Sequence, residues 1–232
     1  MAEKNFEEII EAIGVKPYYL DLEYGQAIYC GDCRDILPLI PDKSIDLVLT
    51  DPPFNAGKDF PNDNLDSGGW AVFCNDFARL LPITANNLIE VDKKDRIMRQ
   101  ALDLYLPYRY AICLNYTNSM RNGTVGYHNW GLVLWYGEGK CYKRYKDRID
   151  SALHSTKAEF SHPSPKEITH YKKLCEMFSH PNGLIVDPFC GSGTTLIGAK
   201  ELNRQCVGIE IEERYCEISA KRCSQSVMKL EV

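Results

Sequence analysis

The sequence has no apolar run that approaches the roughly 18–20 residues needed for a transmembrane helix. Its first eight residues are polar and acidic, which predicts that they are not a secretory signal. With 44% hydrophobic and 25% charged residues, the 232-residue chain has the composition of a soluble globular protein. We therefore expect a cytoplasmic protein of one domain, residues 1–232, without a membrane partner.

A complete metal site is also missing from the sequence. Cys30 and Cys33 have the CxxC spacing, but no second CxxC and no nearby histidine pair completes a zinc ligand set. Cys113, Cys175 and Cys206 lie inside apolar stretches and are typical of small core residues. The ten cysteines thus predict structural thiols rather than a metal or redox centre.

The chain has no excess of positive charge, since 27 Lys and Arg against 32 Asp and Glu give a formal net charge of −5, and this argues against a general nucleic-acid coat protein. One stretch, residues 140–148, differs because it carries five basic residues, one acid and interleaved tyrosines. Such a run is typical either of a nucleic-acid contact surface or of a solvated helix face or loop. The candidate DNA-binding residues in it are Lys143, Arg144, Lys146 and Arg148.

Short apolar runs alternate with amphipathic stretches along most of the chain. This alternation predicts an α/β fold with a doubly wound, mostly parallel sheet of seven strands. A mobile loop rich in Asn, Asp, Gly and Pro is predicted at 55–67. The predicted strands are residues 27–30, 45–50, 87–91, 109–114, 132–136, 184–186 and 206–211. The predicted helices lie in 1–25, 35–40, 69–81, 93–105, 167–178, 194–202 and 213–227.

The stretch Asp51-Pro52-Pro53-Phe54 directly follows the apolar run at 45–50. The prolines restrict the backbone and have no N–H, so the carbonyls of Asp51 and Pro52 are expected to stay free as acceptors. A carboxylate, free carbonyls and a flat ring on one rigid segment suit a planar group that bears an NH2. The alternative is a strand followed by an ordinary Pro-Pro turn.

A second segment, Val186 to Thr195, has a strand that ends in an acid, a glycine turn and the start of a helix. Gly191 and Gly193 are predicted to let the backbone approach a ligand closely. No Gly-Lys-Ser/Thr follows, so the phosphate-binding loop of nucleotide hydrolases is excluded. Asp187 opens the turn and Glu210 ends the next strand, where an acid can accept from ribose hydroxyls. These acids favour a positively charged nucleoside such as S-adenosylmethionine, and a purely structural glycine turn is the alternative.

Together, these segments resemble the amino-group DNA methyltransferases of the β arrangement, in which the catalytic Asp-Pro-Pro-Tyr/Phe precedes the cofactor motif Asp-Pro-Phe-x-Gly-Ser-Gly-Thr-Thr. The resemblance includes Asp46 to Asn55, Gly208 to Tyr215 and His162 to Lys166, and it omits 1–20 and about 116–160. It implies a Rossmann-like, S-adenosylmethionine-dependent methyltransferase fold with circularly permuted motif order. It also implies that residues 116–160 are a small target-recognition insert.

The resemblance implies methyl transfer from S-adenosylmethionine to the N6 amino group of adenine in double-stranded DNA. Asp51 and the Pro52 carbonyl would accept the amino hydrogens, with Pro53 in the rigid segment, and Phe54 would stack on the flipped base. A bacterial or phage origin, a place at the nucleoid, a homodimer and a cognate restriction endonuclease are further implications. The residues expected at the cofactor are Asp32, Cys33, Asp51, Lys166, Asp187, Phe189, Cys190, Gly191, Ser192, Gly193, Thr194, Thr195, Glu210 and Ile211.

Three other functions are weighed against this one. N4-cytosine methylation has the same chemistry, but that branch more often has serine at the position of Asp51. Methylation of RNA or of a protein amide is usually associated with asparagine at this position. A silent cofactor- or DNA-binding module is the third alternative, and the intact catalytic and glycine motifs argue against it. Cytosine C5 methylation is excluded because no proline in the chain is followed by cysteine.

Overall fold

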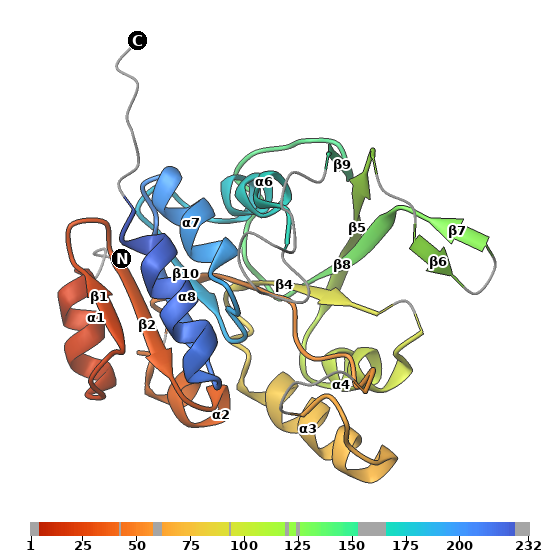
Figure 1. Cartoon of the computed structure of the whole chain (residues 1–232), viewed down its shortest axis with the longest axis horizontal. Coiled ribbons are helices and arrows are strands. Elements are labelled where there is room, and N and C mark those ends of the chain that lie inside the picture. Colours follow the sequence, from red (N-terminus) through yellow and green to blue (C-terminus); the bar gives the residue numbers. More distant parts are fainter. Residues whose placement is uncertain are drawn as a thin grey trace.

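In the computed structural model, a single nine-stranded sheet runs through the molecule, with helices on both faces (Figure 1). The structure describes residues 5–41, 43–57, 62–92, 94–118, 121–123, 126–152 and 166–225. The strands of the sheet are β1 (Tyr19–Asp21), β2 (Gln26–Cys30), β3 (Ile45–Thr50), β4 (Asn86–Val91), β5 (Tyr108–Tyr116), β8 (Trp130–Tyr136), β9 (Arg148–Ser151), β10 (Leu184–Asp187) and β11 (Gln205–Glu210). A separate hairpin consists of β6 (Arg121–Gly123) and β7 (Gly126–His128).

The strand order is β1-β2-β11-β10-β3-β4-β8-β5-β9. The five strands from β2 to β4 are mutually parallel, β8 is antiparallel to both of its neighbours, and β9 is parallel to β5. All seven predicted strands are present, which confirms the doubly wound, mostly parallel sheet. The sequence missed the two edge strands, β1 and β9, because each is only three or four residues long and mixes polar with apolar residues.

Alternating residues of the strands contact helices on opposite faces of the sheet. In β3, Val48 packs in the core beneath the first four helices, whereas Leu47 and Leu49 pack in the core beneath the last three. The first set is α1 (Phe6–Ile13), α2 (Cys33–Ile36), α3 (Ser67–Leu80) and α4 (Arg96–Tyr105), with a 3-10 turn at Leu37–Leu39. The second set is α6 (Ile168–Phe178), α7 (Thr194–Glu201) and α8 (Glu213–Cys223). No described helix is long and apolar enough to cross a membrane.

The stretch 116–160, predicted as a target-recognition insert within the domain, includes the predicted strand at 132–136. Its strand β8 lies inside the sheet, between β4 and β5, and β9 extends the sheet beyond β5. The part that projects from the sheet is the β6–β7 hairpin, seen at the right of Figure 1. Residues 119–120, 124–125 and 153–165 lie outside the described part, as do four residues of the predicted loop at 55–67 and the end of the predicted helix after residue 225.

After the neighbouring parallel strands β3 and β10, at the centre of the sheet, the chain continues toward opposite sides of the sheet. From β3 the chain passes through α3 to β4 on one side, and from β10 it passes through α7 to β11 on the other. In open α/β sheets, such a point leaves a crevice at the carboxyl ends of the strands, and ligands bind there. The two sequence motifs both fall in this crevice, although 136 residues (187 − 51) separate Asp51 from Asp187.

Candidate active site

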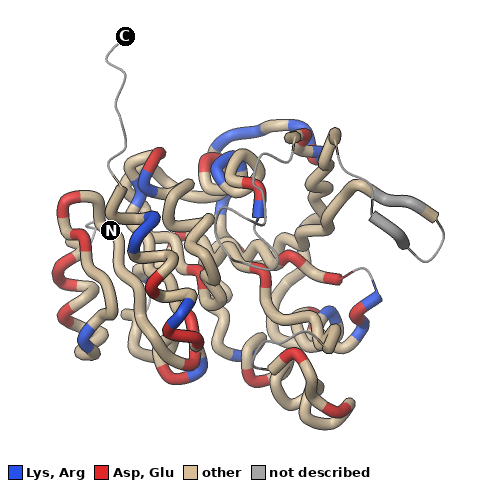
Figure 2. The backbone as a smooth tube through the Cα atoms, viewed as in Figure 1, with Lys and Arg blue, Asp and Glu red and all other residues tan. Residues whose placement is uncertain are grey.

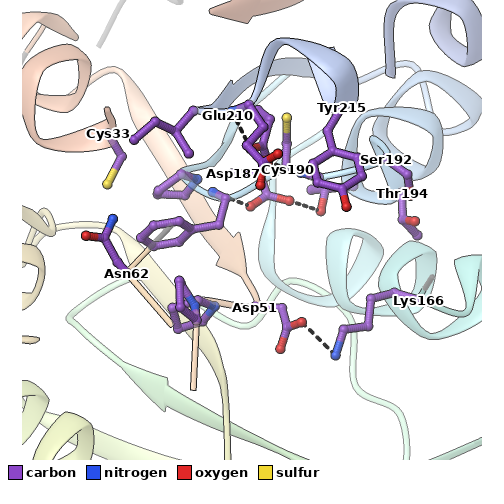
Figure 3. A pocket seen from close by; sticks show the side chains of 18 of the residues that line it. Cys33, Asp51, Asn62, Lys166, Asp187, Cys190, Ser192, Thr194, Glu210 and Tyr215 are labelled. Carbon is purple, nitrogen blue, oxygen red and sulfur yellow. Dashed lines mark hydrogen bonds and ion pairs between the residues drawn. The ribbon is translucent and has the colours of Figure 1, made fainter. Parts of the chain in front are cut away.

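A pocket opens at the carboxyl ends of β2, β11, β10 and β3 (Figure 3). Every catalytic and cofactor residue predicted from the sequence lines it, except Gly193. Several lining residues were not among the predicted site residues; some lie within the predicted motifs or beside them, and others are brought to the pocket by tertiary structure. The lining residues that were not predicted are Gly31, Ala56, Asn62, Asp63, Tyr171, Pro188, Glu212 and Tyr215.

Asp51 lies where the buried strand β3 ends and the rigid Pro52-Pro53 segment begins. Its Oδ2 lies 2.8 Å from Lys166 Nζ, and its Oδ1 is buried without a hydrogen-bond partner among the described residues. Burial raises the pKa of Asp51 to about 7, although the Lys166 charge acts to lower it. The site therefore holds one carboxylate oxygen that is shielded from water and available to a ligand.

Lys166 also contacts a second carboxylate, that of Glu90 on β4. The Lys166 Nζ to Glu90 Oε1 distance is 2.9 Å, and the Tyr171 hydroxyl donates to Glu90 Oε2 at 3.1 Å. Burial lowers the pKa of Lys166, but the carboxylates of Asp51 and Glu90 outweigh burial and raise it above its ordinary value. Lys166 thus lies on the catalytic side of the pocket. One signal in the sequence could have pointed to Glu90, since it is the only charged residue in the predicted strand 87–91.

The loop after Phe54 is tied to the site by two polar side chains. Asp63, only 2% exposed, accepts a hydrogen bond from the backbone N–H of Phe54 at 2.9 Å. Asn55 donates to the Leu65 carbonyl at 3.0 Å and accepts from the Leu65 N–H at 2.8 Å. These contacts fix the backbone that carries the Phe54 ring, and the ring is only half-buried at the pocket wall.

Asp187 uses both of its carboxylate oxygens within the protein. Oδ1 accepts from the Thr50 hydroxyl at 2.7 Å and from the Phe189 N–H at 3.1 Å, while Oδ2 accepts from the Thr195 hydroxyl. Burial raises the pKa of Asp187 to about 6, and these hydrogen bonds oppose the rise. Asp187 therefore ties the catalytic strand β3 to the glycine turn and the start of α7.

Gly193 is the one predicted cofactor residue that is not in the pocket lining. Its φ is +80°, and a Cβ there would lie 2.2 Å from the Ser219 hydroxyl oxygen on α8. A glycine at this position therefore lets α8 pack against the turn. Gly191, also at positive φ, does line the pocket.

Glu210 ends β11 with its carboxylate at the pocket. Oε2 accepts from the Gly191 N–H at 3.0 Å and Oε1 from the Glu212 N–H at 2.9 Å, which fixes the orientation of the group. Burial raises the pKa of Glu210. The neighbouring Ile211 is 42% exposed and gives this end of the pocket an apolar surface.

Negative charge dominates the described lining, which has six acidic residues and one lysine. Asp32, at the start of α2, is paired with Arg34 at 2.6 Å, and the hydrogen bonds from Arg34 hold the pKa of Asp32 below its usual range. Cys33 is buried and Cys30 exposed, and both are free thiols. No group of three or more His, Cys, Asp or Glu in the described residues is arranged to hold a metal ion.

The basic run at 140–148 starts near the other edge of the sheet. Because β8 is antiparallel to β4, it ends beside the start of β4, with Tyr136 opposite Asn87, and the run follows from there (Figure 2). Its lysine at 143 pairs with Glu176 and its arginine at 148 pairs with Asp150 at 2.8 Å, while the residues at 144 and 146 are exposed. None of the predicted DNA-binding residues, Lys143, Arg144, Lys146 and Arg148, lines the pocket. The run ends at Arg148, which pairs with Cys113 on β5 at the level of the carboxyl end of β4.

Comparison with known proteins agrees with this geometry. A family model described as DNA methylase, for N6 and N4 methyltransferases, matches residues 45–221. The type II methyltransferase M.HpaI of Haemophilus parainfluenzae is 28% identical over 235 residues, which cover 85% of this chain and 74% of that enzyme. M.HinfI of Haemophilus influenzae is 27% identical over 258 residues, covering 86% and 68%.

A solved structure of the PvuII DNA methyltransferase, described as cytosine-N4-specific, has the same fold. It has a TM-score of 0.75 and 19% identity, and the match covers 92% of this chain and 90% of that one. The family model spans well over half of this sequence and includes both motifs that line the pocket. The chain therefore belongs to the DNA methylase family of amino-group (N6-adenine and N4-cytosine) methyltransferases.

Proposed function

We propose that this DNA methyltransferase acts on the N6 amino group of adenine. The observation that carries the proposal is the buried, unpartnered Oδ1 of Asp51, which lies beside the rigid Pro52-Pro53 backbone. An amino group on a flat base can donate its two hydrogens to Asp51 and to the Pro52 carbonyl. Aspartate at this position is what favours adenine over cytosine in the resemblance to the family.

Members of this family take the methyl group from S-adenosylmethionine, whose positively charged sulfur makes the methyl carbon electrophilic. The chemistry of the pocket fits such a group, because its lining is acidic and has an apolar end. Glu210 is held so that it can accept from ribose hydroxyls, while Phe189 and Ile211 offer apolar contact to the adenine ring. Asp187 shapes the turn between these residues and Asp51.

The role of the catalytic residues follows from the weakness of the nucleophile. The lone pair of an exocyclic amino group is delocalised into the base, so the nitrogen reacts only when its geometry becomes more tetrahedral. Hydrogen bonds to Asp51 and to the Pro52 carbonyl favour that geometry, and the rest of catalysis is positioning. Phe54 stacks on the base after it leaves the duplex, which offsets part of the few kcal/mol that extrusion costs.

The test is nucleoside analysis of DNA treated with the purified protein and labelled S-adenosylmethionine. N6-methyladenine is the expected product. N4-methylcytosine would overturn the adenine assignment and keep the mechanism, and the likeness of the fold to the PvuII enzyme makes this the second candidate. A homodimer and a cognate restriction endonuclease stay predictions of the sequence.

The position of the basic run leads to a prediction about DNA binding. We expect that replacing Arg144 and Lys146 with alanine leaves the salt dependence of DNA affinity unchanged, because both are exposed and neither lines the pocket. For comparison, the same substitution is made at Lys94 and Arg96, two exposed basic residues that follow β4 at the pocket edge. The logarithm of the DNA association constant falls as the logarithm of the salt concentration rises. Each lost phosphate contact makes this slope less steep by about 0.9.

Fluorescence anisotropy of a labelled duplex at several salt concentrations measures both slopes. We expect the slope to be less steep by about 1.8 in the Lys94/Arg96 variant and unchanged in the Arg144/Lys146 variant. The reverse pattern would restore the DNA-binding role that the sequence assigned to the basic run.

A further inference from the structure

The lysine between Asp51 and Glu90 is part of a buried cluster with one cation and two anions. The side chains of Lys166, Asp51 and Glu90 are 15%, 23% and 9% exposed. Lys166 Nζ is within 2.9 Å of one oxygen of each carboxylate. Since all three groups are shielded from water, a change of charge on one is felt strongly by the others.

Glu90 is held in this cluster by its surroundings. The Tyr171 hydroxyl on α6 donates to its Oε2, while Lys166, just before α6, contacts its Oε1. On the neighbouring strand β8, a Cβ at position 131 would lie 3.1 Å from Oε1, and the residue there is Gly131. The fold thus leaves room for this carboxylate and supplies donors for both of its oxygens.

Glu90 is not needed to neutralise Lys166, because Asp51 already does so. A lysine with one carboxylate would make a neutral buried pair, whereas the second carboxylate gives the cluster a net charge of −1. Such an arrangement costs desolvation free energy and is weak as a device for stability. The second carboxylate has a chemical effect, however, because Glu90 competes with Asp51 for the ammonium group of Lys166.

We propose that Glu90 is a positioning residue for methyl transfer, which shares the ammonium group of Lys166 with Asp51 and so keeps Asp51 able to accept a proton from the target amino group. This inference rests on the proposed function of the site. The charged groups that face Asp51 are Lys166, Glu90 and Asp187. Of these, Lys166 lowers the pKa of Asp51, while Glu90 and Asp187 add to the rise that burial causes.

The proton balance of the reaction explains why the extra charge is useful. The amino nitrogen forms a bond to the methyl carbon as the carbon–sulfur bond breaks, and the bonding pair stays on sulfur. The nitrogen is left with a surplus proton and a positive charge, and the proton passes to Asp51 Oδ1 and then to solvent. With Glu90, the cluster changes from −1 to neutral; without it, a neutral pair would become a buried cation.

Two variants shift the proton affinity of Asp51 in opposite directions. Glu90→Gln keeps the size of the side chain and leaves Lys166 to Asp51 alone, so the pKa of Asp51 is expected to fall by about one unit. Lys166→Gln removes the cation, so the pKa is expected to rise by about one unit. The exposed pair of Lys143 and Glu176 supplies a control, Glu176→Gln, which is expected to shift nothing.

Carboxyl-carbon NMR titration of the free protein measures the Asp51 midpoint directly, with the signal assigned from its loss in Asp51→Asn. Single-turnover methylation from pH 5 to 9 then measures the acid limb of the rate. In each variant, the acid limb of the rate profile is expected to move with the titration midpoint of Asp51. Glu90→Gln is also expected to lower the plateau rate about tenfold. An unmoved midpoint in both variants, or lower activity without a shifted limb, would overturn the proposal.

These measurements distinguish failure of the proposed function from failure of the role proposed for Glu90. If the wild-type protein methylates no DNA base, the proposed function fails, whereas the NMR midpoints still test Glu90 without turnover. If Glu90→Gln does not fold, as judged by thermal melting, the upward shift in Lys166→Gln tests the cluster from its other side. No upward shift would then overturn the role of the cluster.

Discussion

Replacing Asp51 with alanine is expected to slow methyl transfer by about 10³-fold or more. The variant removes the shielded oxygen that accepts an amino hydrogen and the group that takes the surplus proton. It is expected to stay folded, because Lys166 keeps its contact with Glu90. Single-turnover methylation at pH 8 measures the loss, with DNA affinity and melting temperature as checks.

Asp51→Asn is the matched control for charge. The amide keeps one acceptor oxygen and loses the negative charge, so the loss in rate is expected to be smaller, about 10²-fold. Activity within tenfold of the wild type in the alanine variant would remove Asp51 from the mechanism. Equal losses in both variants would show that the charge, rather than the acceptor geometry, dominates.

Replacing Gly193 with alanine is expected to have the largest effect on stability. Its φ of +80° is strained for alanine, which we expect to cost about 1 kcal/mol, and the new Cβ would clash with Ser219, which adds about 1–3 kcal/mol. A total near 3 kcal/mol corresponds to a fall of roughly 6–12 °C in melting temperature for a protein of this size.

Gly14 at the end of α1 provides the control, because its φ is +67° and no atom lies closer than 3.9 Å to a Cβ built there. Gly14→Ala should therefore show the backbone cost alone. Adding Ser219→Ala to Gly193→Ala removes the hydroxyl oxygen from the clash and should restore part of the melting temperature. Equal losses for the two glycines would contradict the packing role assigned to Gly193.

The sequence predicted the sheet and most of the pocket because both depend on local patterns. Short apolar runs predict buried strands whatever their partners, and each motif directly follows one of these runs. Asp51 and Asp187 could thus be placed at the same edge of the sheet before their contacts were known. The parallel centre of the sheet then follows from the alternation of strands and helices.

Contacts between distant segments could not be predicted in this way. Glu90 and Lys166 are 76 residues apart, and nothing in the sequence around either shows that they meet. The direction of β8 is equally hidden, because an apolar strand has the same pattern whichever way it runs. That direction decides that the chain leaves β8 at the edge opposite the pocket, shortly before residues 140–148.

The strand order also has a consequence for folding during synthesis. The central strands β10 and β11 are made after β2 and β3, yet in the sheet they lie between them. Until β10 and β11 emerge from the ribosome, β2 and β3 each have an unpaired parallel edge, and open strand edges favour aggregation. In the nascent chain, the edge of β3 therefore stays open until β10 has been made, and that of β2 until β11, which ends at Glu210, has been made and can pair with it.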